Sequence, residues 1–169
     1  MKLSRTPAWN VLGESQKGAW LDIVEVATDG RLAVPIVLRR RVDWAEPSEN
    51  LALLSRILVD GTVVLEPLEA GASDLEALTQ VLQGAEEEER ATLTFAAMAT
   101  RNRIALQPDG RLRLSPLLAD HLEAEPGARV WVGALDDRIR LWSRTGWQRL
   151  MAESHRRLAD ALDADRSAA

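Results

Sequence analysis

The sequence predicts an α+β fold in which one β-rich unit occurs twice in a single chain. The main observation is an internal repeat, because Asp-Gly-Arg-Leu stands at residues 29–32 and again at 109–112. Each copy is followed by a short apolar stretch, a proline (Pro35 or Pro116) and a helix-like pattern. A repeat of this kind indicates one supersecondary unit used twice.

The composition is that of a globular protein that lacks cysteine. The chain has 169 residues, 46% apolar and 28% charged, which suffice for one good core or two small interlocked cores. The absence of cysteine excludes disulfides, thiol catalysis and thiolate metal sites. Residues 1–5 lack the apolar run of a signal peptide, and no stretch approaches the roughly 20 apolar residues of a membrane span. We therefore expect a cytoplasmic protein with no membrane partner.

The net charge of −5 is concentrated in the middle of the chain. Residues 1–60 carry eight basic and eight acidic side chains, and residues 101–169 carry twelve and ten. Residues 61–100 carry one arginine and eight acids, a net charge of −7. Because local charge rather than total charge attracts a polyanion, the two ends that carry the repeats allow a basic surface.

Strand, turn and helix signals follow one another along the chain, with Gly and Pro marking the boundaries. In the first half we expect a hairpin over 21–34 and then a helix from Pro35 to about Trp44. A second hairpin is expected from strands at 51–54 and 62–65 around Asp60-Gly61. Two helices should follow, one opened by a capping box at Ser73 to Glu76 and one over 86–98. In the second half we expect strands at 103–106 and 111–114, followed by a helix capped by Ser115 with Pro116 in its first turn. A hairpin should form from 130–132 and 139–142. The last helix is opened by a capping box at Thr145 to Gln148 and should run to about Ala161 before a frayed end.

This layout divides the chain into five segments. They are a loose lead-in at 1–18, a first repeat at 19–72, connecting helices at 73–100, a second repeat at 101–153, and a C-terminal helix extension and tail at 154–169.

Several motifs, taken in their order and spacing, resemble those of a known family. They are Val130-Trp131-Val132-Gly133, then Arg138-Ile139-Arg140-Leu141-Trp142 with Trp147, then Gly30 to Pro35 with Arg39, and Asp60 to Leu68. With these motifs the chain is similar, over about residues 18–153, to the MraZ-type members of the AbrB-like (SpoVT-AbrB) transcriptional regulators.

The resemblance implies a tandem duplicated, swapped-hairpin β-barrel with peripheral helices. It further implies an oligomeric, nucleoid-associated regulator of transcription that binds double-stranded promoter DNA through two hairpin loops and often assembles into rings. The candidate DNA-binding residues are Thr28, Arg31, Arg39, Arg40, Arg111 and Arg113.

The chain departs from the family pattern at the loops. The family carries Asp-x-x-x-Arg in each hairpin loop, but Ala27 and Gln107 stand where the aspartates are expected. The loop tips carry Asp29 and Asp109 where a base is expected. Either acid would repel phosphate if it faced the DNA, but an Asp next to Gly commonly folds back to cap its own turn, and we favour that interpretation.

Each basic candidate also has a structural interpretation. Arg31 and Arg111 suit a contact to DNA or an internal ion pair equally well. Arg39-Arg40-Arg41 forms either a DNA-backbone patch or a solvated helix face, and three consecutive helical residues cannot share one face. For Arg101 and Arg103 we favour a polar sheet face over DNA contact.

The six tryptophans are expected mainly in the core or in subunit contacts. Trp131, Trp142 and Trp147 fall within strand and helix patterns, whereas Trp9, Trp20 and Trp44 lie where they could anchor a partner.

No pattern of a catalytic or metal site is present. The chain lacks a phosphate-binding glycine loop, a Gly-x-Ser-x-Gly motif and a His-Glu-x-x-His motif, and His121 and His155 stand alone. We therefore expect no enzyme, no cofactor and no small-molecule substrate.

Three functions remain open. The first is a MraZ-like DNA-binding regulator. The second is a DNA-binding-deficient relative that acts as an oligomeric scaffold or co-assembles with another protein, which the altered loops suggest. The third is an antitoxin of the AbrB class.

Overall fold

Strands and helices follow the same order in both halves of the chain, apart from one additional helix. The computed structural model describes residues 19–169. The first half comprises β1 (Trp20–Glu25), β2 (Arg31–Ala33), α1 (Ile36–Arg39), β3 (Leu51–Ile57), β4 (Val63–Pro67), α2 (Ala72–Gly84) and α3 (Glu87–Thr100). The second comprises β5 (Arg101–Leu106), β6 (Arg111–Arg113), α4 (Pro116–His121), β7 (Arg129–Leu135), β8 (Arg138–Ser143) and α5 (Arg144–Ala168).

The strands form one antiparallel sheet in the order β1-β7-β8-β4-β3-β5-β6-β2. The sheet curls into a nearly closed barrel, because the edge strands β1 and β2 meet at the first turn. In that turn the Ala27 N–H donates to the Arg31 carbonyl at 3.0 Å, and the Gly30 N–H donates to the Ala27 carbonyl at 2.9 Å. β1 pairs with β7 and β5 with β3, so the first strand of each half lies beside a strand of the other half. The α+β class expected from the sequence is confirmed.

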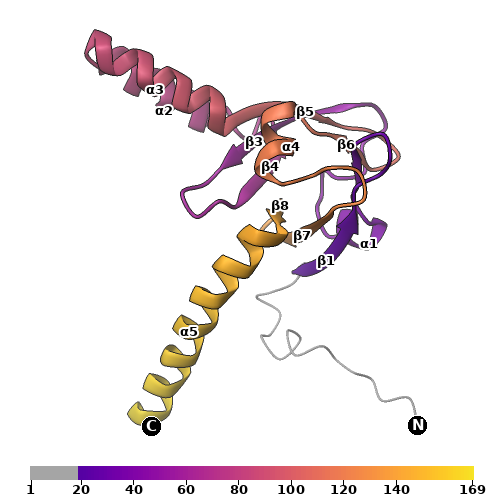
Figure 1. Cartoon of the computed structure of the whole chain (residues 1–169), viewed down its shortest axis with the longest axis vertical. Helices are drawn as coiled ribbons and strands as arrows, with labels where there is room; N and C mark the ends of the chain where they lie inside the picture. The colour runs from indigo at the N-terminus through magenta and orange to yellow at the C-terminus, as the bar shows by residue number, and fades with distance from the viewer. Residues whose placement is uncertain (1–18) are drawn as a thin grey trace.

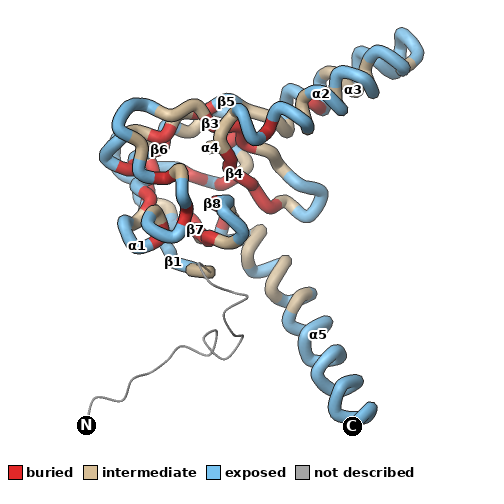
Figure 2. Tube along the Cα trace, turned by 180° about the vertical axis from the view of Figure 1, so that it is seen from behind, coloured by how far each residue is buried: buried red, intermediate tan, exposed pale blue. Residues whose placement is uncertain are grey.

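The core lies inside the barrel and is closed by two short helices. Alternate residues of each strand point inward, as the two-residue period of a strand requires, and most of these are leucine, valine or isoleucine. Leu38 of α1 and Leu118 of α4 occupy corresponding places and are both 0% exposed. Figure 2 shows the buried residues gathered in the strands, whereas the long helices are mostly exposed.

The helical hairpin α2–α3 and the helix α5 project from the barrel in different directions (Figure 1). Neither α2 nor α5 contains a buried residue, and α3 contains only Ala97. The barrel therefore supplies most of the burial, and the projecting helices offer large exposed surfaces. None of the helices between residues 19 and 169 is long and apolar enough to cross a membrane.

Two expectations about the first half are wrong. The hairpin expected over 21–34 is split, because after the turn β2 pairs with β6 rather than with β1. The helix expected from Pro35 to Trp44 ends at Arg39. The residues that follow are drawn to the β7–β8 turn, where the Trp44 indole donates to the Asp137 carbonyl at 2.7 Å.

Helix ends were also predicted incorrectly where a capping box was expected. α2 begins after Gly71 without a side-chain cap, and Ser73 lies inside the helix. α5 is capped two residues earlier than expected, by Ser143, whose Oγ accepts from the Gly146 N–H at 2.9 Å. It continues to Ala168, beyond the expected end. The cap at Ser115 is confirmed, with Pro116 in the first turn.

Candidate functional site

The two Asp-Gly turns of the repeat lie side by side because the strands that follow them pair with each other. β2 pairs antiparallel with β6, so that Arg31 lies opposite Arg113 and Ala33 lies opposite Arg111. Residues directly opposite each other in such a pair project from the same face. The leucine in the centre of each strand is fully buried, so this shared face points outward. We call the three guanidinium groups on it the arginine ribbon (Arg31, Arg111 and Arg113).

The aspartate at each loop tip closes its own turn. Asp29 Oδ1 accepts from the Arg31 N–H at 3.0 Å, and Asp109 Oδ1 accepts from the Arg111 N–H at 3.1 Å. In both turns the other carboxylate oxygen lies 3.6 Å from Nε of the same arginine. The capping interpretation is therefore confirmed, and each tip carboxylate neutralises part of the charge of its neighbour.

The two loop arginines differ in what holds them. Arg31 Nη1 donates to Oε1 of Gln107 in the other turn at 3.2 Å, and its side chain is 27% exposed. The corresponding residue of the first turn is Ala27, whose methyl group cannot accept a hydrogen bond. The Arg111 side chain is 52% exposed. Arg111 is thus the more available of the two for an external anion.

A hollow of about 260 Å³ lies between the turns. Its lining is mixed in charge and consists of Glu25, Ala27, Thr28, Asp29, Arg31, Ala33 and Arg111. Thr28 is exposed at the tip of the first turn, and its contact with DNA stays a prediction.

Arg39 braces the second turn rather than standing free on a helix face. Its Nε donates to the Val34 carbonyl at 3.2 Å, and the Val34 N–H in turn donates to the Gly110 carbonyl at 2.9 Å. A Cβ atom placed on Gly110 would come within 2.5 Å of Arg39 Nε. The guanidinium therefore packs directly over this glycine and fixes the loop.

The three consecutive arginines that begin at Arg39 point to different surroundings, because α1 ends at Arg39. Arg40 is exposed, whereas the Arg41 guanidinium lies over the ring of Trp20, 4.6 Å from its centroid. The three side chains therefore do not form one patch, and of the two candidates Arg39 and Arg40 the second is the more exposed.

A matched pair of glycine substitutions tests the brace. Gly30 and Gly110 both have φ near +80° to +87°, but only Gly110 has a side chain over it. We expect Gly30→Ala to lower the free energy of unfolding by about 1 kcal/mol, the cost of left-handed backbone. Gly110→Ala should cost up to about 1 kcal/mol more, because Arg39 must move and give up its hydrogen bond to the Val34 carbonyl. Urea unfolding measures both, and equal losses would contradict the brace.

Two arginines of the neighbouring strand β5 have different roles. Arg103 is exposed and lies two residues from Ala105, which is paired with Arg113, so it extends the outer face of the arginine ribbon. Arg101 is held by Asp74 through hydrogen bonds of 2.7 and 3.1 Å. Only Arg103 therefore adds free positive charge.

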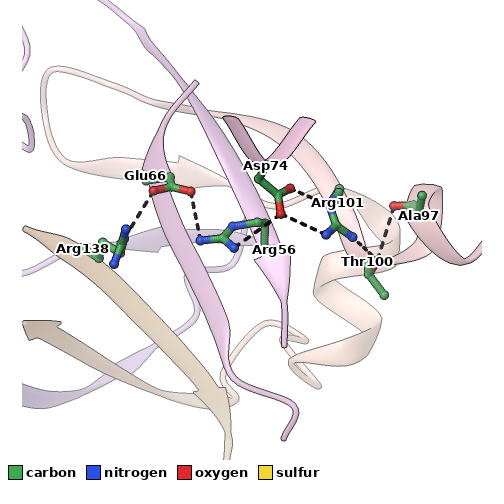
Figure 3. Close-up of polar contacts among 7 residues, drawn as sticks. All are labelled: Arg56, Glu66, Asp74, Ala97, Thr100, Arg101 and Arg138. Carbon is green, nitrogen blue, oxygen red and sulfur yellow. Dashed lines mark hydrogen bonds and ion pairs between the residues drawn. The ribbon is translucent and has the colours of Figure 1, made fainter. Parts of the chain in front are cut away.

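A chain of ion pairs anchors the α2–α3 hairpin to the barrel (Figure 3). Glu66 on β4 lies 3.1 Å from Arg56 and 3.3 Å from Arg138, and only 6% of its side chain is exposed. Arg56 also lies 3.6 Å from Asp74 on α2, which binds Arg101. Five charges from four strands and one helix are thus joined, and this role was not predicted from the sequence.

Asp74 makes this anchor sensitive to acid. The hydrogen bond from Arg101, helped by the charges of Arg101 and Arg56, holds the pKa of the Asp74 carboxyl below its usual value of 3.8. A carboxyl whose pKa is lower in the folded state stabilises the fold above its unfolded-state pKa and loses that contribution as the pH falls through the folded-state value.

The Asp74→Asn variant tests this dependence. We expect the variant to lose about 1–2 kcal/mol of unfolding free energy at neutral pH, because a charge-assisted hydrogen bond is weakened. The difference from the unmodified protein should shrink as the pH falls below about 3.8. Urea unfolding at neutral and acidic pH measures it, and a difference that stays constant would assign the effect to packing.

The tryptophans of the described chain serve the fold. Trp147 stacks on Trp131 with 6.3 Å between ring centroids and meets Trp142 edge-on at 5.0 Å. Trp142 also donates its indole N–H to Thr62 at 2.8 Å. Trp9 lies outside the described residues, so its suggested role as an anchor stays a prediction.

The histidines give no sign of a metal site. His121 Nε2 lies 2.8 Å from the Gly61 carbonyl and ties α4 to the β3–β4 turn, and His155 is exposed on α5. Within residues 19–169, no group of three or more His, Cys, Asp or Glu side chains is arranged to hold a metal ion.

No protein-family model matches the chain, and no curated protein is significantly similar to it in sequence. The arginine ribbon and its two capped turns therefore carry the functional argument.

Proposed function

We propose that this protein is a MraZ-like, oligomeric regulator of transcription that contacts repeated sites in promoter DNA with its two hairpin loops. The observation that carries the proposal is the arginine ribbon. Residues 31, 111 and 113 are far apart in the chain, yet the β2–β6 pairing collects their guanidinium groups on one outward face. Arg103 on β5 extends that face.

The strand pairing supports a duplicated, swapped-hairpin barrel. β1 pairs with β7 and β5 pairs with β3, so that each half contributes its first strand to the third strand of the other half. In addition, two pairs join strands that occupy the same position in the two halves: β2 pairs with β6, and β4 pairs with β8. This is the pattern of an approximate two-fold axis that relates the halves.

The ribbon has a shape and chemistry suited to duplex DNA. Arginine pairs with guanine in the major groove, and guanidinium groups also bind phosphate in a bidentate manner. Each neutralised phosphate releases counterions, which drives association at low salt. Oligomerisation would place several ribbons along repeated sites, so that avidity multiplies a weak single contact.

Unequal effects of the two loop arginines test the proposal. We expect Arg111→Ala to weaken binding to a duplex selected from a random library by roughly tenfold, because one bidentate contact is worth about 1–3 kcal/mol. Arg31→Ala should have a smaller effect, since Gln107 already holds that side chain. Fluorescence anisotropy at about 50 mM salt measures both.

Arg90→Ala provides the control, because Arg90 lies on α3 and donates to the Leu82 carbonyl of α2 at 2.9 Å. It should bind DNA as the unmodified protein does. Equal losses in all three variants would reduce the effect to net charge, and no loss at Arg111 would remove that residue from the interface.

A second candidate function is a scaffold of the same fold that has lost DNA binding and co-assembles with another protein. The observation in its favour is that Asp29 and Asp109 lie 3.6 Å from the arginines they would have to release. Glu25 adds a further acid at the hollow between the turns. The absence of binding in the DNA assay, together with co-purification of a related protein, would favour this candidate.

A further inference from the structure

Helix α5 projects from the barrel with little to support it. Its 25 residues correspond to a length of about 37 Å at 1.5 Å per residue. Among residues 19–169, it is the beginning of the helix that packs on the barrel, through Trp147 against Trp131 and Trp142. Figures 1 and 2 show the rest of the helix extending away from the strands, and most of it is exposed. In proteins most helical stability comes from the packing of an apolar face, and within residues 19–169 the projecting part of α5 has little such packing.

An apolar stripe follows one face of the projecting part. The stripe consists of Met151, Leu158, Ala161 and Leu162, with the small polar Ser154 between the first two, and spacings of three and four residues place these side chains on one side of the helix. Leu158 is 62% exposed and Leu162 is 49% exposed. At the barrel the stripe joins an open apolar hollow, which is lined in part by Trp20, Leu21, Leu135, Trp142, Trp147 and Met151.

The charges that flank the stripe are divided between the two ends of α5. Residues 144–157 carry four arginines and one glutamate, whereas residues 158–168 carry three aspartates and one arginine. The first part thus has a net charge of +3 and the second a net charge of −2. A second α5 helix placed in the same direction would bring like charges together, but one placed in the opposite direction would bring opposite charges together.

We propose that α5 pairs antiparallel with α5 of a second copy of this chain, with the apolar stripes in contact. The charge division selects both the partner and its direction, because the complement of each half of α5 is the other half of the same helix. The pairing names one contact of the oligomer in the proposed function and to that extent rests on it. It needs no DNA, so it is tested on the free protein.

Cysteine cross-linking tests the direction, and the absence of native cysteine makes each introduced thiol unique. Met151→Cys and Leu162→Cys proteins are treated with a short bis-maleimide linker, separately and as a mixture. We expect linked dimers mainly in the mixture, because antiparallel stripes place the start of one helix beside the end of the other. Ala159→Cys, on an exposed position outside the stripe, is the control and should remain unlinked.

Leu158→Glu tests the stripe itself. This substitution removes one apolar contact from each helix, so we expect the dissociation constant of the dimer in sedimentation equilibrium to rise roughly tenfold or more. Ala159→Glu adds the same charge one residue away and should leave the constant nearly unchanged. Circular dichroism checks that both variants keep their helix content.

Two results would overturn the pairing. Efficient linking within each single-cysteine protein, with none added by mixing, would show parallel helices. The absence of cross-links together with an association state that is indifferent to Leu158→Glu would show that another surface, or another protein, covers the stripe. DNA binding that fails while mixed cross-links form would reject the proposed function and retain the helix pair.

Discussion

Glu66→Ala is expected to lower the free energy of unfolding by about 3 kcal/mol, the low end of the range for removing one member of a buried ion pair. The Glu66 residue is 4% exposed and lies between two arginines. Its loss leaves Arg56, whose side chain is 22% exposed, near Arg138 without the negative charge that lies between them. The low end applies because both arginines reach solvent in part.

Urea unfolding with the linear extrapolation measures this loss. Glu69→Ala is the control, since Glu69 lies three residues further along the chain and is exposed, and it should change stability little. Arg138→Ala should cost no more than about 1 kcal/mol, because 44% of that side chain is exposed and Arg56 still pairs with Glu66. A loss for Glu66→Ala that is no larger than for Glu69→Ala would mean that the ion-pair chain adds nothing to stability.

Replacing the whole arginine ribbon is expected to reduce DNA affinity by at least about 100-fold, which corresponds to about 2.7 kcal/mol. The variant carries Ala at positions 31, 111 and 113. The expected loss combines direct contacts with counterion release, because three phosphates would no longer be neutralised. Anisotropy with the same selected duplex measures it, and urea unfolding confirms that the barrel is intact.

The control removes the same number of charges elsewhere. It carries Ala at positions 90, 144 and 166, which are exposed and lie on helices outside the ribbon. We expect it to lose little affinity. If both triple variants lose affinity equally, the effect is one of net charge and the ribbon has no special role.

Local signals in the sequence predicted the turns and most strands. Asp60-Gly61 and Asp136-Asp137 mark hairpins that the structure confirms, with positive φ at Gly61 and at both aspartates. Ser115 caps its helix as expected. These features depend on residues that are neighbours in the sequence, so they can be predicted from the sequence.

Features that depend on distant residues were missed. The helix after Pro35 is cut short because Trp44 binds Asp137, which is 93 residues away. Ser73 does not cap α2, and the acid beside it serves Arg101 instead. Neither contact has a signal in the local sequence, since each depends on how the barrel closes.

The candidate site was predicted in part. The repeat placed Arg31 and Arg111 after matching turns, but it did not show that their strands pair with each other and bring Arg113 onto the same face. The role of Gln107 was also missed, although its mismatch with Ala27 was visible as a difference between the two copies. Arg39 was grouped with Arg40, and only the structure shows that it holds a loop.

The salt dependence of DNA binding tests the central claim most directly. If the three arginines of each protomer neutralise three phosphates, the logarithm of the association constant should fall against the logarithm of salt concentration with a slope of about −2.7 per bound protomer. The variant that lacks the ribbon should give a markedly shallower slope. The same slope in both proteins, or no binding by the unmodified protein even at about 50 mM salt, would contradict the claim.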